Sequence, residues 1–143
     1  MKRRIILWTA GLLALLVFTR CHFVAPPLRR ADAVLTVKTT GYCACPECSG
    51  WKFNWIGLPV SPKGRSKVIG QTSGGSIARP GTVAVDPKAF PPGTKFYIPG
   101  YGWSRADDIG GKGRSLDLYF WRHSAAEKWG VQTKKVKVWY PKK

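Results

Sequence analysis

The chain has 143 residues, 44% of them apolar and 13% aromatic, which is enough for one packed domain and too little for two. It carries 24 Lys and Arg against 7 Asp and Glu, a formal charge of +17. Such a charge attracts polyanions, but no nucleic-acid-binding motif accompanies it. We therefore expect no nucleic acid partner, and expect instead the anionic polymers or lipid surface of a cell envelope.

The first residues are typical of a targeting segment. Basic residues at 2–4 precede an apolar stretch at 5–18, the order found in signal peptides. The one Ala-x-Ala site, at 31–33, lies far downstream of the apolar stretch. Residues 1–33 are thus predicted to be a removed signal peptide, or a retained apolar anchor helix followed by a linker. The protein is expected in the cell envelope, anchored in the inner membrane or secreted or periplasmic.

Residues 34–143 are predicted to form one all-β domain. Six segments have apolar or β-branched alternation and are separated by Gly and Pro turns: 34–40, 82–86, 95–99, 103–108, 115–120 and 134–140. Strands of this number and spacing favour a small closed barrel. A short helix is predicted at 124–129, and the stretch at about 43–80 is predicted to be a long surface loop.

Four of the seven acids fall between Asp86 and Asp117. In the segment 115–120, two leucines alternate with Asp117 and Tyr119, so burial of the leucines would direct both polar side chains to an open groove. In an acid-poor chain, carboxylates gathered in this way indicate a site.

The same alternation sorts the other acids. It sets Ala106 and Asp108 on one face of their strand and leaves Asp107 on the other face as a solvated neighbour. Asp86, at a strand end, has two readings that stay open. It either accepts hydrogen bonds from turn amides or belongs to the site.

Two carboxyls in one cleft can divide acid–base work between them. Because both cannot ionise cheaply, one acquires a raised pKa and keeps its proton, which is what a departing glycosidic oxygen needs. Asp117 fits the acid, and Asp108 fits its charged partner. The alternative is that both are ordinary strand-end residues paired with Arg105, Lys112 or Arg114.

The run from Gly81 to Tyr119 resembles the three-aspartate (3D) domain family, whose members are double-psi β-barrels related to membrane-bound lytic transglycosylase A. The resemblance extends upstream to 39–45 and 70–74, and downstream through 126–130. It implies a six-stranded double-psi β-barrel with one or two short helices over residues 34–143.

The resemblance also implies an activity, cleavage of peptidoglycan between N-acetylmuramic acid and N-acetylglucosamine. Asp117 would protonate the leaving oxygen and then take the proton of the 6-hydroxyl, which leaves a 1,6-anhydro end without water or a cofactor. Asp108 would assist it. The partner would be peptidoglycan glycan strands, bound by a monomer. Two alternatives stay open, a noncatalytic glycan-binding barrel and a hydrolase of the same bond.

Six further positions are expected to contact substrate. They are Asp86, Tyr42, Thr72, Gly110, Gly111 and Tyr119, with the two glycines letting backbone approach the sugar closely. The chain departs from the family pattern where Ile109 replaces a threonine and where the stretch before Asp117 is about two residues shorter. That shortening could displace Asp108 from Asp117.

Three cysteines, Cys43, Cys45 and Cys48, lie close enough in sequence to share a metal, but without a nearby histidine they make an incomplete zinc site. No metal is therefore expected. In an exported protein a disulfide is favoured, Cys45–Cys48 or Cys43–Cys48, and a metal site or free thiols stay open as the alternatives. His123, just before the predicted helix, is expected at the surface.

Overall fold

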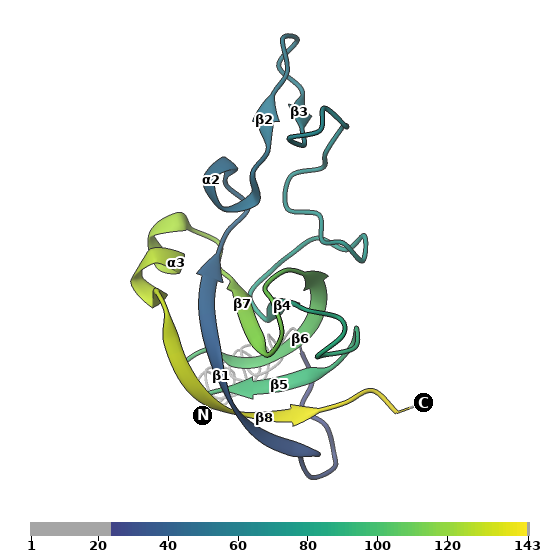
Figure 1. Ribbon diagram of the computed structural model, residues 1–143, viewed down its shortest axis with the longest axis vertical. Coiled ribbons are helices and arrows are strands. Elements are labelled where there is room, and N and C mark those ends of the chain that lie inside the picture. Colours follow the sequence, from purple (N-terminus) through teal and green to yellow (C-terminus); the bar gives the residue numbers. More distant parts are fainter. Residues whose placement is uncertain (1–23, 143) are drawn as a thin grey trace, which may run out of the picture.

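The computed structural model describes residues 24–142 (Figure 1). Most of the predicted leader, residues 1–23, lies outside the described residues. Within 24–142, no helix is both long and apolar enough to cross a membrane.

Six strands close into a barrel in the order β1-β7-β4-β6-β5-β8. Their bounds are Ala33–Tyr42 (β1), Thr82–Val85 (β4), Lys95–Ile98 (β5), Gly102–Ile109 (β6), Ser115–Tyr119 (β7) and Gln132–Trp139 (β8). β1 pairs in parallel with β7, and β4 with β6, while the other pairs are antiparallel. Each predicted strand overlaps one of these six, so the closed six-stranded β-barrel is confirmed.

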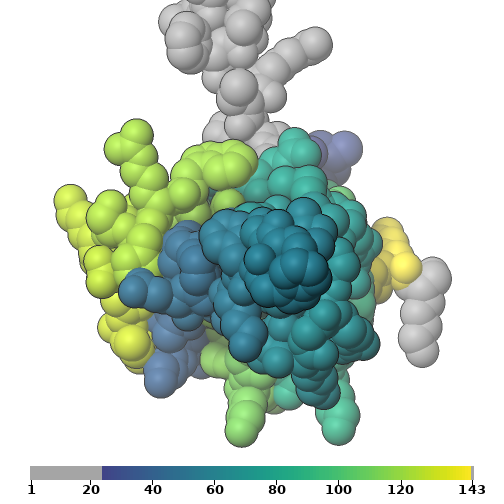
Figure 2. Space-filling view, turned by 90° about the horizontal axis from the view of Figure 1, so that it is seen from above, coloured from purple at the N-terminus to yellow at the C-terminus, as the bar shows by residue number. Residues whose placement is uncertain are grey.

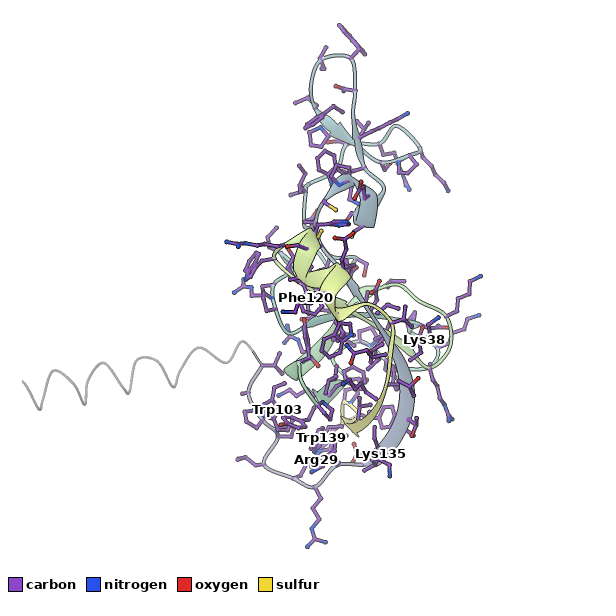
Figure 3. All side chains as sticks on the ribbon, turned by 90° about the vertical axis from the view of Figure 1, so that its left-hand side faces the viewer. Arg29, Lys38, Trp103, Phe120, Lys135 and Trp139 are labelled. Atoms are coloured by element: carbon purple, nitrogen blue, oxygen red, sulfur yellow. The ribbon has the colours of Figure 1, made fainter. Side chains whose placement is uncertain are left out.

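Alternation along the strands fills the barrel interior. The core includes Val83, Val85, Phe96, Ile98, Leu116, Leu118, Val136 and Val138, none more than 2% exposed. Each such side chain contributes about 1.5–3 kcal/mol by leaving water. Trp103 and Trp139 pack together at the end of the barrel away from the hairpin of β2 (Lys52–Phe53) and β3 (Pro59–Val60), with ring centroids 4.9 Å apart (Figure 3).

The predicted helix is present as α3 (His123–Trp129), and it lies against β1. A glycine at position 41 allows this approach, since a Cβ there would lie 2.8 Å from the Ala126 carbonyl oxygen. The close contact brings the first residue of α3, His123, beside the turn that follows β1.

The predicted long loop between β1 and β4 has secondary structure of its own. It contains α2 (Pro46–Ser49) and a hairpin of β2 (Lys52–Phe53) and β3 (Pro59–Val60). The hairpin projects away from the barrel (Figure 1). Seen from above, the segment 43–81, called the excursion below, lies in front at the centre of the molecule (Figure 2). Trp51 fastens its base, because the indole is buried and donates to the Ala44 carbonyl at 2.8 Å.

Candidate functional site

A pocket of about 410 Å³ lies between the barrel and the excursion. Its walls come from the ends of β1, β6 and β7 and from the stretch 67–78. Six of the predicted site residues line it, namely Tyr42, Thr72, Asp108, Gly110, Asp117 and Tyr119. Residues separated by up to 77 positions therefore meet in one cavity.

Asp117 enters the pocket from β7 between two fully buried leucines, as the alternation predicted. The Thr40 hydroxyl, opposite it on β1, donates to Asp117 Oδ1 at 2.8 Å. Burial raises the pKa of Asp117, the Thr40 hydrogen bond works against that rise, and the negative charge of Asp108 adds to it. The net result is a carboxyl that keeps its proton to higher pH than an exposed aspartate.

Asp108 is held at the end of β6 by three donors. Its Oδ2 accepts from the Tyr42 hydroxyl at 3.0 Å. Its Oδ1 accepts from the backbone amides of Ser73 at 2.8 Å and Ile109 at 2.9 Å. Ile109 stands where the family resemblance implies a threonine, and its backbone amide still donates a hydrogen bond to Asp108.

A β-bulge decides which face Asp108 occupies. Val83 pairs with Ala106 and the next residue of β4 pairs with Asp108, so Asp107 is the extra residue. Ala106 is therefore buried in the core while Asp108 lines the pocket, and the expectation that they share a face was wrong. Asp107 is also not simply solvated, since it pairs with Arg105 Nε at 2.7 Å.

Tyr42 is the side-chain hydrogen-bond donor to Asp108. Burial raises the pKa of its phenol, and the charge of Asp108 and its hydrogen bond to that carboxylate raise the pKa further. The phenol consequently stays protonated and remains a donor to Asp108. Its ring packs edge-on against Tyr119 at 5.4 Å between centroids.

Asp86 does not line this pocket. Its two oxygens accept from the amides of Lys88 at 2.9 Å and Gly113 at 3.0 Å. These hydrogen bonds lower the pKa of Asp86. Of the two readings left open by the sequence, the turn-binding one matches this geometry, with the carboxylate fixing the loop before β7.

Gly110 and Gly111 occupy backbone positions that favour a residue without a side chain. A Cβ on Gly110 would lie 3.0 Å from the Ala84 Cβ, so its absence lets the loop close on the barrel wall. Gly111 is outside the pocket lining and has φ of +71°, a conformation that favours glycine. The sugar contacts expected at Gly110 and Gly111 stay predictions.

Sequence reasoning missed Thr40 and Ser73 as contacts of the two carboxyls. Thr40 had a usable signal, because it lies two residues before Tyr42 and so shares its face of β1. Ser73 lies in the stretch 70–74 that the resemblance covers, but no periodicity indicates it, since its amide reaches Asp108 from an irregular segment 35 residues away.

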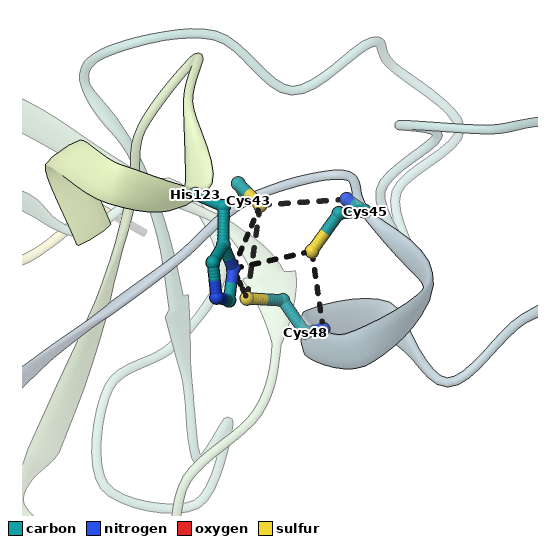
Figure 4. Close-up of side chains that lie close together, drawn as sticks. All are labelled: Cys43, Cys45, Cys48 and His123. Atoms are coloured by element: carbon teal, nitrogen blue, oxygen red, sulfur yellow. Dashed lines mark hydrogen bonds between the residues drawn. The ribbon is translucent and has the colours of Figure 1, made fainter. Parts of the chain in front are cut away.

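The three cysteines lie together beside a histidine. Cys43, Cys45 and Cys48 are not bridged to one another in the structure, and a Cys45–Cys48 or Cys43–Cys48 disulfide stays a prediction. His123 is not merely a surface residue, because its Nδ1 lies 3.8, 3.4 and 3.5 Å from the three sulfurs in that order (Figure 4). The histidine that the local sequence lacks is supplied by α3.

The barrel and its pocket define a small six-stranded β-barrel protein with paired carboxyls at one mouth. Residues 81–142 match the family model described as the 3D domain. Residues 81–142 thus contain a 3D domain, which confirms the resemblance drawn from the aspartate motifs.

Two relatives from Bacillus subtilis (strain 168) extend the match. The chain is 36% identical over 108 residues to YabE, named provisionally as a cell wall shaping protein, across 73% of this chain and 23% of that relative. It is 47% identical over 113 residues to the cell wall-binding protein YocH, across 77% of this chain and 34% of YocH. The chain thus spans about a quarter to a third of the length of these relatives.

Proposed function

We propose that this protein cleaves peptidoglycan glycan strands as a lytic transglycosylase, with Asp117 as its general acid and base. The observation that carries the proposal is a half-buried carboxyl facing a pocket, with a pKa raised by burial and by the charge of Asp108. The two parallel strand pairs, β1–β7 and β4–β6, support the double-psi form of the barrel that the family resemblance implies.

The chemistry follows from the two states of Asp117. In its protonated state it donates to the glycosidic oxygen as the bond from the muramic acid C1 to that oxygen breaks. The carboxylate that remains takes the proton of the 6-hydroxyl, whose oxygen then bonds to C1 and closes the 1,6-anhydro ring. The proton balance closes on Asp117, and no water is consumed.

Asp108 and Tyr42 support this proton transfer by Asp117. The Asp108 carboxylate raises the pKa of Asp117 and places negative charge near the oxocarbenium-like centre. Tyr42 fixes the position of that carboxylate through its hydroxyl. Thr72, Tyr119 and Gly110 line the same cavity and would contact the sugar.

The names of the relatives support a role at the cell wall. One is called a cell wall shaping protein and the other a cell wall-binding protein. The second name, with the formal charge of +17, also favours an alternative in which the barrel binds wall glycan without cleaving it. Either role places the protein in the cell envelope, exported, and either anchored or released.

The test is incubation of the full chain with purified peptidoglycan, followed by mass analysis of the soluble products. Anhydro ends support the proposal, and reducing ends indicate hydrolysis of the same bond. Wall binding without release indicates the noncatalytic alternative. Asp117→Asn is expected to abolish release while binding persists. Asp107→Asn is a matched control, since Asp107 does not line this pocket.

A further inference from the structure

Four metal-binding side chains meet outside the carboxyl pair. The sulfurs of Cys43, Cys45 and Cys48 and a ring nitrogen of His123 all lie within 4.8 Å of one another. Three come from the turn after β1 and from α2, and the fourth comes from the start of α3 (Figure 4). Segments 75 residues apart thus bring one ligand atom each to a common centre.

The separations match those of a tetrahedral metal site. Zinc binds sulfur at about 2.3 Å and imidazole nitrogen at about 2.0–2.1 Å, so the edges of such a tetrahedron are about 3.8 Å between sulfurs and about 3.6 Å between sulfur and nitrogen. The Cys43 and Cys48 sulfurs are 3.7 Å apart. The three sulfur–nitrogen separations are 3.8, 3.4 and 3.5 Å.

The outer contacts also suit a metal. Nε2 of His123, the nitrogen that faces away from the sulfurs, lies 3.1 Å from a Glu47 oxygen and 3.3 Å from a Glu127 oxygen. Carboxylates on the far nitrogen of a ligating histidine fix its ring and make it a better ligand. The carboxylates thus hold Nδ1 toward the three sulfurs.

The sulfurs have donors of their own. The backbone amide of Cys45 points to the Cys43 sulfur at 3.4 Å, and that of Cys48 points to the Cys45 sulfur at 3.5 Å. Backbone amides stabilise thiolates, which are the form that binds a metal. The backbone amides of this short turn therefore point toward the cysteine sulfurs.

We propose that Cys43, Cys45, Cys48 and His123 bind a structural Zn²⁺ in a closed, four-coordinate site. Three thiolates and one imidazole are a donor set that zinc favours, and a site without an open position serves structure rather than catalysis. A disulfide would use two of the thiols and would give the histidine no reason to face all three.

The zinc would fasten the wall of the pocket. It ties the turn that follows Tyr42 to the start of α3, and Cys48 itself lines the pocket. Tyr42, directly before the first ligand, donates to Asp108. Metal binding would therefore hold Tyr42, the hydrogen-bond partner of Asp108, in place. The zinc proposal stands whether or not the glycan is cleaved.

The test measures metal on the full chain, purified without chelator, by elemental mass spectrometry. About one zinc per chain is expected, as in structural sites of this type. Cobalt exchanged into the protein should give the charge-transfer and d–d absorption of a tetrahedral cobalt–thiolate site. Less than a tenth of an equivalent of zinc, with no such spectrum after reduction and reloading, would overturn the proposal.

Variants then identify the ligands. Cys48→Ser and His123→Asn should lose zinc to a chelator concentration that the parent chain withstands. The matched controls are Cys21→Ser and His22→Asn, which remove the same residue types elsewhere in the chain and should keep their zinc. Equal retention by all four variants would rule out this cluster as the site. If a ligand variant fails to fold, the cobalt spectrum of the parent chain still decides, since it reports thiolate ligation directly.

Discussion

At the scale of single residues, three effects on the pKa of Asp117 determine whether its carboxyl keeps its proton. Burial among the barrel strands raises its pKa, the Thr40 hydroxyl counters the rise, and the Asp108 charge adds to it. Asp108 can act in this way because three donors, Tyr42 among them, keep its carboxylate in place. The acid form of Asp117 thus depends on a neighbour that the chain supplies from another strand.

This dependence predicts the effect of Asp108→Asn. Removing the negative charge removes one cause of the raised pKa, so the pKa of Asp117 should fall. Because the acid must be protonated, the alkaline limb of the glycan-release rate should move to lower pH, together with any loss of rate. A pH profile measures the shift, and a carbon NMR titration of the Asp117 carboxyl checks it independently. A limb that stays in place or moves to higher pH would contradict the account.

At the scale of secondary structure, one bulge and one close contact position the site. The bulge in β6 turns Asp108 from the core face to the pocket face. The contact of α3 with β1 at Gly41 brings His123 to the cysteine turn. Both are departures from regular strand packing, and each moves one functional side chain to its place.

Gly41→Ala should separate α3 from β1. Its Cβ would lie 2.8 Å from a backbone oxygen and 3.0 Å from a Cα of α3, and neither can rotate away. Overpacking of this kind costs about 1–3 kcal/mol of unfolding free energy. Gly74→Ala should cost less, because its Cβ would meet nothing closer than 3.3 Å. Urea titrations of both variants measure the difference, and equal stability of the two would show that the helix contact is not tight.

At the scale of the whole molecule, charge governs the approach to the wall. From residue 34 onward the chain has 18 basic and 6 acidic residues, which gives 18 − 6 = +12. The acids of the pocket lie within this positive field, so an anionic polymer would be attracted to the molecule as a whole. Contacts inside the pocket would then select the glycan.

Salt separates long-range attraction from local contacts. The screening length falls from about 10 Å at 0.1 M salt to about 3 Å at 1 M. The fraction of the full chain that sediments with purified wall should therefore decrease steadily as salt rises. A bound fraction that does not change across this range would assign the affinity to stacking and hydrogen bonds instead.

The six strands, the α3 helix and the side of β7 on which Asp117 lies could all be predicted from the sequence. These features follow from local alternation, since buried leucines at 116 and 118 leave position 117 on the pocket face. The aspartate motifs determined the family for the same reason, because their residues lie within one continuous run.

Which distant residues meet depends on how the strands and helices pack together. The bulge at Asp107 depends on pairing with β4, and no periodicity within β6 reveals it. Thr40 reaches Asp117 through a parallel pairing across 77 residues. His123 reaches the three thiols because Gly41 lets α3 approach β1. Barrel closure brings such distant segments together, and the spacing of residues along the chain does not predict which segments will meet.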